Sequence, residues 1–140
     1  MARISSNTAL RKKVSKELVK RVKRAVNNAY APYSGISVGA ALYCANGNIY
    51  TGCNIENSSY SLTTCAERVA LFKAISEGER NFLLLLLYSP QVDSILPCGA
   101  CLQVFSECAP EIIIATMNMN NEFHFYPLQT LLTKPFNLNK

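Results

Sequence analysis

Hydrophobic residues recur along this chain with two different periods, and each period predicts a different kind of element. In residues 8–30, apolar residues return at every fourth position while Lys and Arg fill most other faces, which predicts an amphipathic helix. From Phe82 to Tyr88 every residue is apolar. This run indicates a strand buried on both faces, although a short helix has the same signature.

The same patterns predict alternating helices and strands along the rest of the chain. Asn46-Gly47 is a strong hairpin signal between two short strands. Gly78 marks the end of one helix, and Pro97 marks the start of another. The other predicted elements are strands at residues 36–43, 48–51, 111–116 and 122–126 and helices at residues 65–77, 97–108 and 128–132. This alternation predicts a single α/β layered domain over residues 1–140.

Composition and charge narrow the class of protein. With 140 residues, 49% of them hydrophobic and 16% charged, the chain has the composition of one folded domain, which excludes a disordered chain. The formal net charge is +5, but residues 1–24 alone carry nine basic residues and one acid, so the other 116 residues carry −3. The basic character therefore belongs to one N-terminal segment, which we interpret as a solvated helix face and not as a guide to the substrate.

Nothing in the sequence has the pattern of a targeting signal or a membrane span. The N-terminus is polar, and a transmembrane helix needs about 20 apolar residues, far more than the run at Phe82–Tyr88. We therefore expect a cytoplasmic protein with no membrane partner. In a reducing compartment, closely spaced cysteines bind metals or act in catalysis more often than they form disulfides.

Two cysteine motifs lie at predicted helix starts. Cys65-Ala66-Glu67 opens one helix, and Cys98-Gly99-Ala100-Cys101 opens another. Three thiolates bind Zn²⁺ at about 2.3 Å each. They leave the fourth tetrahedral position open, as in catalytic zinc sites. The positive ends of the two helices, together with Arg68, offset the negative charge of the thiolates. The motifs therefore predict a catalytic zinc site with the carboxylate of Glu67 beside it.

Other interpretations of these residues remain open at this point. Thr64-x-x-Glu67 has the spacing of a capping box, in which the glutamate only accepts a backbone N–H. His124 as a fourth ligand would make a structural Cys₃His site. The basic helix would suit a zinc-stabilised nucleic-acid-binding module, but it has no aromatic residue before Tyr30 on which a base could stack.

Five sequence blocks together resemble the small zinc-dependent cytidine deaminases. The blocks are AYAPYS (residues 29–34), VGAAL (38–42), GCNIENSSYS (52–61), CAERVALFKAISEG (65–78) and PCGACLQVFSE (97–107). A Cys-x-Glu motif followed by Pro-Cys-x-x-Cys is the signature of zinc nucleobase deaminases. The resemblance covers residues 29–132 and implies a three-layer α/β/α fold with a mixed sheet of about five strands.

The resemblance also implies an activity and assigns roles to residues. The activity is hydrolytic deamination of cytidine and 2′-deoxycytidine to uridine and 2′-deoxyuridine in pyrimidine salvage, with one Zn²⁺ per subunit. Cytosine in an antibiotic or a polynucleotide is the alternative substrate. Glu67 is implied as the catalytic proton shuttle. The other implied roles are metal binding by Cys65, Cys98 and Cys101, substrate binding by Asn54, Glu56, Tyr60 and the Ala66 backbone, and hydrogen bonding of Arg68 to the sulfurs.

The resemblance further implies a homotetramer acting on a small nucleoside, with nucleic acid not expected as a partner. Three positions depart from the family pattern. Relatives often have Arg where this chain has Leu102, and an aromatic residue where it has Ile36. Near the C-terminus, Phe136 follows LLTKP instead of LLPGA, and in the family the aromatic residue reaches a neighbouring subunit's site. We expect Leu102 to leave one charge near the thiolates uncompensated.

Overall fold

The computed structural model describes residues 8–138. The predicted domain of residues 1–140 extends beyond this range at both ends. In chain order, the elements are α1 (Thr8–Lys13), α2 (Lys16–Val26), β1 (Gly39–Cys44), β2 (Ile49–Cys53), the 3₁₀ helix η1 (Tyr60–Leu62), α3 (Ala66–Ser76), β3 (Phe82–Tyr88), α4 (Gly99–Cys108), β4 (Ile113–Met117), β5 (Phe123–Pro127) and α5 (Leu128–Leu131). No helix within residues 8–138 has the length and apolar character needed to cross a membrane.

The five strands form one mixed sheet in the order β2-β1-β3-β4-β5. β3 and β4 run parallel, and the other neighbouring pairs run antiparallel. A parallel pair needs a long crossover, and here α4 lies in the connection between β3 and β4. The mixed five-stranded sheet expected from the resemblance is confirmed.

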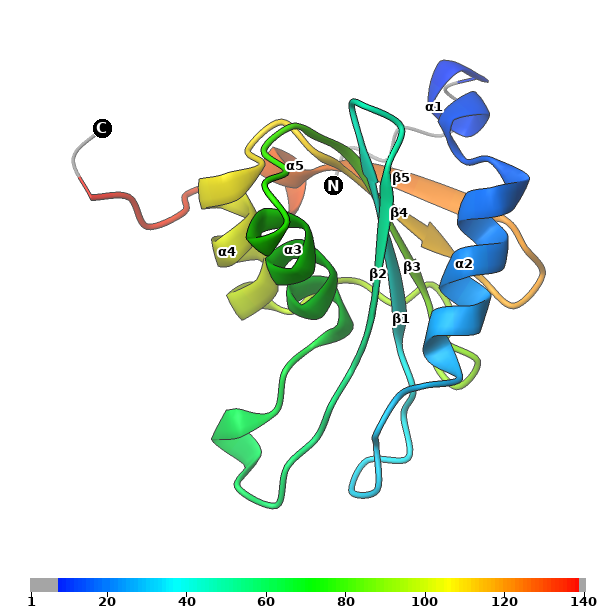
Figure 1. The fold of residues 1–140 in the computed structure, drawn as a ribbon, viewed down its shortest axis with the longest axis vertical. Helices are drawn as coiled ribbons and strands as arrows, with labels where there is room; N and C mark the ends of the chain where they lie inside the picture. The colour runs from blue at the N-terminus through cyan, green and yellow to red at the C-terminus, as the bar shows by residue number, and fades with distance from the viewer. Residues whose placement is uncertain (1–7, 139–140) are drawn as a thin grey trace.

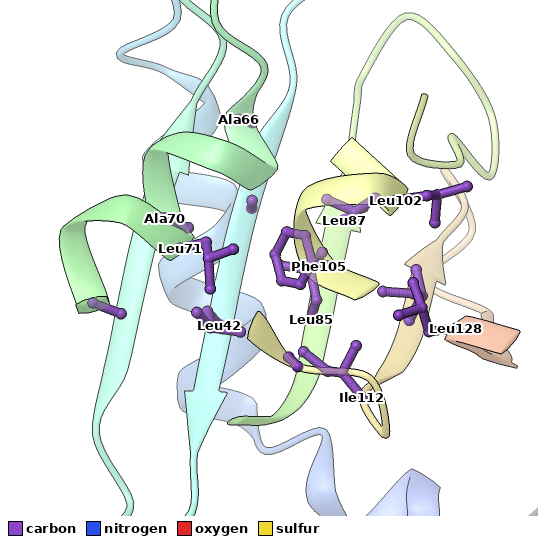
Figure 2. Close-up of a cluster of buried hydrophobic side chains, with 14 of the residues drawn as sticks. Leu42, Ala66, Ala70, Leu71, Leu85, Leu87, Leu102, Phe105, Ile112 and Leu128 are labelled. Carbon is purple, nitrogen blue, oxygen red and sulfur yellow. The ribbon is translucent and has the colours of Figure 1, made fainter. Parts of the chain in front are cut away.

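Side chains on the strands alternate between two hydrophobic cores because successive residues of a strand point to opposite faces. On β3, Leu85 and Leu87 belong to the core under α3, α4 and α5, whereas Leu84 and Leu86 belong to the core under α2. Figure 1 shows α2 on one side of the sheet and α3 and α4 on the other. Figure 2 shows Phe105 of α4 in the first of these cores. The three-layer architecture is therefore confirmed.

The prediction of one continuous amphipathic helix over residues 8–30 is wrong. Two helices, α1 and α2, occupy this part of the chain. Ser15 is the N-cap of α2, and its Oγ accepts the backbone N–H of Leu18 at 3.1 Å. Serine is favoured at such a position because its hydroxyl satisfies a free donor of the first turn. The apolar residues of both segments keep the same spacing, so their periodicity does not reveal the break.

Two polar loops, residues 27–38 and 54–65, extend beyond the same end of the sheet (Figure 1). The Tyr30 N–H donates to the Asn54 carbonyl at 3.0 Å, and the Glu56 N–H donates to the Tyr30 carbonyl at 2.8 Å. Ile55 also forms an isolated bridge with Thr64. The backbone therefore fixes both loops next to the start of α3.

Candidate active site

Three cysteine side chains from two helices meet near this end of the sheet. Cys65 is the N-cap of α3, Cys98 is the N-cap of α4, and Cys101 lies in the first turn of α4. The Cys98 Sγ lies 3.6 Å from the Cys101 Sγ and 3.9 Å from the Cys65 Sγ. The structure thus brings together the three cysteines that the two sequence motifs singled out.

The spacing of the sulfur atoms fits a tetrahedral zinc ion. Two thiolates bound to Zn²⁺ at about 2.3 Å and at a tetrahedral angle lie about 3.8 Å apart, which agrees with the two measured separations. Cys101 is buried, Cys65 is half-buried and Cys98 is exposed, so the cluster is accessible from one side. A three-thiolate set with one open side is the donor set of a catalytic zinc site.

Arg68 supplies positive charge to the cluster. Its Nη2 donates to the Cys65 Sγ at 3.5 Å, and its Nε is buried with no hydrogen-bond partner. A hydrogen bond from Cys101 and then one from Arg68 hold the pKa of Cys65 down at about 5, against the effect of burial. The same bond to Cys65, together with burial, raises the pKa of Cys101. The site therefore favours a thiolate at Cys65 before any metal is considered.

Glu67 lies in the first turn of α3 and is only 5% exposed. Burial raises the pKa of Glu67 to about 7, and the negative charge of Cys65 adds to the rise, while a backbone hydrogen bond and Arg68 oppose it. A carboxyl group that titrates near neutral pH gives up and takes back a proton easily, as general acid–base catalysis requires.

Neither structural alternative for these residues is formed. A capping box needs Thr64 as the N-cap, but the N-cap of α3 is Cys65, and no side chain caps this helix. Thr64 instead exchanges backbone hydrogen bonds with Ile55. Within residues 8–138, the group able to hold a metal consists of the three cysteines alone, and His124 lies on β5 opposite Thr116.

The two polar residues expected to hold the substrate have their own partners in the loops. Asn54 is buried; its Oδ1 accepts the Val38 N–H at 2.8 Å, and its Nδ2 donates to the Ile36 carbonyl at 2.7 Å. Glu56 accepts the Ser34 hydroxyl at 2.6 Å and a backbone N–H from both Tyr33 and Ser34. The hydrogen bonds from Ser34 lower the pKa of Glu56, so this side chain is held as a carboxylate.

Glu56 and Tyr60 share an open pocket of about 370 Å³ with Tyr33, Ser34 and Thr63. Tyr60 is 74% exposed, and its ring meets that of Tyr33 edge-on at 5.8 Å between centroids. The bridge between Ile55 and Thr64 joins the wall of this pocket to the residue that precedes Cys65. Of the predicted substrate residues, Glu56 and Tyr60 therefore line this pocket, Ala66 follows Cys65 at the sulfur cluster, and Asn54 is bound to the backbone of the first loop.

The three departures from the family pattern have different surroundings. Leu102 is 7% exposed and packs in the core under α3 and α4 (Figure 2). Ile36 is exposed, and its carbonyl accepts a hydrogen bond from the Asn54 Nδ2. Phe136 is 72% exposed in the C-terminal segment.

One contact of the C-terminal segment was not anticipated from the sequence. The Gln103 side chain of α4 donates to the Phe136 carbonyl at 2.8 Å and accepts the Phe136 N–H at 3.0 Å. We call this pair of bonds the Gln103 clamp. Gln103 follows Cys101 by two residues, but glutamine has no local pattern that would have identified a partner 33 residues away. The clamp fixes the backbone at Phe136 while its ring stays exposed.

Comparisons with known proteins identify what the chain is similar to. The family model described as "Cytidine and deoxycytidylate deaminase zinc-binding region" matches residues 12–117. Cytidine deaminase from Sporosarcina psychrophila is 43% identical over 121 residues, which cover 86% of this chain and 89% of the relative. Cytidine deaminase from Halalkalibacterium halodurans is 48% identical over 93 residues, which cover 66% of this chain and 70% of the relative.

Solved structures give the same result for the fold. The crystal structure of cytidine deaminase from Burkholderia pseudomallei superposes with a TM-score of 0.80 at 37% identity. The match covers 94% of this chain and 100% of that chain. The α/β sheet and its helices therefore follow the arrangement found in solved cytidine deaminases.

Proposed function

The chain belongs to the cytidine deaminase family, and from that premise we propose which of its residues carry out the hydrolytic deamination of cytidine to uridine and ammonia. The family match and the relatives establish the enzyme class and zinc as the cofactor. The sulfur cluster next to the buried Glu67 is the observation that carries the assignment of residues.

We assign Cys65, Cys98 and Cys101 as the zinc ligands. Their spacing suits tetrahedral coordination, and their exposure leaves one side of the cluster open. Bound Zn²⁺ supplies Lewis acidity that makes a water molecule nucleophilic at neutral pH. Arg68 supports the ligands by donating a hydrogen bond to Cys65.

Glu67 is the proton carrier of the proposed mechanism. Water adds to C4 of the cytosine ring, and one water proton moves through the Glu67 carboxylate to ring N3. The second water proton then moves to the amino group, the C4–N4 bond breaks, and ammonia leaves. The burial of Glu67 supports this role because a carboxyl kept away from bulk water exchanges protons with the ring and not with solvent.

The two loops beside α3 are proposed to bind the nucleoside. The backbone N–H of Ala66 lies in the first turn of α3, where helix N–H groups have no partner within the helix, and so it is available to the pyrimidine. Asn54, Glu56 and Tyr60 would hold the sugar, with Glu56 kept ionised by Ser34. Contacts through the 3′-hydroxyl make both cytidine and 2′-deoxycytidine substrates.

We further propose that the enzyme is a cytoplasmic homotetramer in pyrimidine salvage. All six cysteines are unpaired, as expected in a reducing compartment. Large exposed apolar side chains, including Tyr60, Leu62 and Phe136, are typical of surfaces that associate. Activity that falls on dilution in step with dissociation, measured by light scattering, is the expected result. A fully active monomer would contradict the tetramer.

The substrate assignment is tested by measuring ammonia release from the purified zinc protein. The panel is cytidine, 2′-deoxycytidine, cytosine, CMP, a cytosine-containing antibiotic and short RNA. We expect release from the two nucleosides, with kcat/KM values within about a hundredfold of each other. A site that hydrogen-bonds the 2′-hydroxyl would reject the deoxynucleoside by about 10⁴-fold or more, and that result would overturn the proposed sugar contacts.

A further inference from the structure

A second polar pocket lies against α2, the helix on the face of the sheet opposite α3 and α4. It has a volume of about 400 Å³ and is lined by Arg21, Arg24, Ala25, Asn27, Asn28 and Thr51. This lining joins the C-terminal half of α2 to the edge strand β2. None of these residues belongs to the cysteine cluster or to the pocket around Tyr60.

The guanidinium groups of the two arginines have no partner among the residues that the structure describes. No hydrogen bond, ion pair or ring contact joins the side chain of Arg21 or Arg24 to the residues in 8–138, including Glu17 one turn before Arg21. Other cations of α1 and α2 are engaged: the Lys23 Nζ donates to the Asn121 Oδ1 at 2.7 Å, and the Arg11 guanidinium lies 4.1 Å from the centre of the Phe123 ring. Arg21 is half-buried and Arg24 is exposed.

Backbone carbonyls beside the pocket already accept hydrogen bonds from the protein. The carbonyls of Arg24, Ala25 and Val26 at the end of α2 each accept a backbone N–H from the residues that follow. The Thr51 carbonyl accepts a hydrogen bond from Lys73 of α3. No carboxylate lines the pocket, and the side chains of Asn27, Asn28 and Thr51 add neutral donors.

We propose that this pocket is a binding site for a phosphate monoester of about the size of a mononucleotide. A guanidinium presents paired donors that match phosphate oxygens, and two unpartnered guanidinium groups supply such donors to one anion. The volume falls within the range of small-molecule pockets, about 300–1,000 Å³. Amide and hydroxyl groups beside the arginines suit the sugar or base of a nucleotide.

The composition of the pocket favours a discrete ligand over a nucleic-acid strand. Strand-binding surfaces combine positive charge with aromatic side chains on which bases stack, and no aromatic residue lines this pocket. The site lies apart from Glu67 and the thiols, so a bound phosphate ester is not the substrate of the deamination. The proposal therefore stands independently of the residue roles assigned above.

The test is isothermal titration of the zinc-loaded enzyme with three probes: inorganic phosphate, ribose 5-phosphate and AMP. We expect saturable binding with one site per chain and retained binding in the presence of excess cytidine. Arg21→Gln and Arg24→Gln should each weaken the binding by about 10-fold or more, since each removes a charge-assisted hydrogen bond. Tighter binding of AMP than of the other two probes would support the mononucleotide, and equal affinities of the three probes would overturn it in favour of free phosphate.

The matched control removes the same charge at two positions of α1 and α2 outside the pocket. Lys12 and Lys20 do not line it, so the double variant Lys12→Gln/Lys20→Gln should bind the probes as the parent does. An equal loss of affinity in this control and in Arg21→Gln/Arg24→Gln would show that the probes are held only by the overall positive charge of the helices. That result would overturn the proposal. Absence of binding by all three probes, or binding of a 20-nucleotide RNA alone, would overturn it as well. Cytidine turnover, unchanged in all variants, verifies that each one is folded.

Discussion

α2 and α3 are helices of equal length, 11 residues each, on opposite faces of one sheet. Each has a glutamate as its second residue, and each packs over a glycine of a neighbouring strand. The two helices differ in the surroundings of their glutamates. Glu17 of α2 is exposed, and charged residues fill the outer face of that helix. Glu67 of α3 is buried beside the thiols of Cys65 and Cys101.

The starts of the two helices differ in the same way. The Ser15 hydroxyl caps α2 by accepting a backbone N–H, and this hydrogen bond stabilises the helix. Cys65 and Cys98 occupy the N-cap positions of α3 and α4 without capping them. Their side chains do not accept the first-turn N–H groups, and the thiols lie close to one another. At the starts of α3 and α4, a position that could stabilise the helix instead carries a thiol of the sulfur cluster.

The largest effect that tests this comparison is expected at the two N-caps. Cys65→Ala should lose bound zinc and all measurable deamination because two thiolates remain of the proposed three. Ser15→Ala should keep zinc and turnover and lower the free energy of unfolding by about 0.5–2 kcal/mol, the usual value of a serine cap. Metal analysis, ammonia release and urea denaturation measure these outcomes. Full zinc content in Cys65→Ala would refute the ligand assignment.

The two glutamates give the next largest effect. Glu67→Gln should retain zinc and the fold, yet lower kcat by about 10²–10⁴-fold because the amide does not carry a proton. Glu17→Gln is the matched control. It should leave kcat unchanged and cost at most about 1 kcal/mol, since it removes only a favourable charge near a helix N-terminus. Equal kcat values for Glu67→Gln and the parent would reject the proton-carrier role.

The two glycines separate packing from catalysis. A Cβ at Gly39 would lie within 3.0 Å of the Val22 carbonyl of α2, and one at Gly52 would lie within 3.0 Å of the Ala66 carbonyl of α3. Both alanine variants should lose about 1–3 kcal/mol of stability through overpacking. Only Gly52→Ala should also lower kcat, because it displaces the residue between Cys65 and Glu67. Equal kcat losses in the two variants would contradict this division between the faces.

Most of the fold was predictable because hydrophobic period and turn residues report local structure. The strand at Phe82–Tyr88 matches its predicted bounds, and the hairpin at Asn46-Gly47 joins β1 to β2. The break before α2 was missed because the apolar positions Val14 and Leu18 keep a four-residue spacing across it. The side chain of Ser15 starts a new helix at this point, and the spacing of the apolar residues does not reveal it.

The candidate site was predictable only in part. The cysteine motifs indicated a metal site because thiols at this spacing have few other uses in a reducing environment. The burial of Glu67 depends on α3 packing against the sheet, and the partners of Glu56 lie more than 20 residues earlier in the chain. The pocket beside α2 was equally hidden, since the sequence showed the basic residues but not that Thr51 of β2 faces them.

The Gln103 clamp affects which side chains residue 136 can carry. Both of its hydrogen bonds engage the main chain of Phe136, and neither depends on the phenyl ring. Every amino acid except proline has the N–H that the clamp uses, so natural drift or a directed library can exchange the side chain at this position without moving its point of attachment. Residue 136 is therefore a site where new surface chemistry can evolve on a fixed anchor.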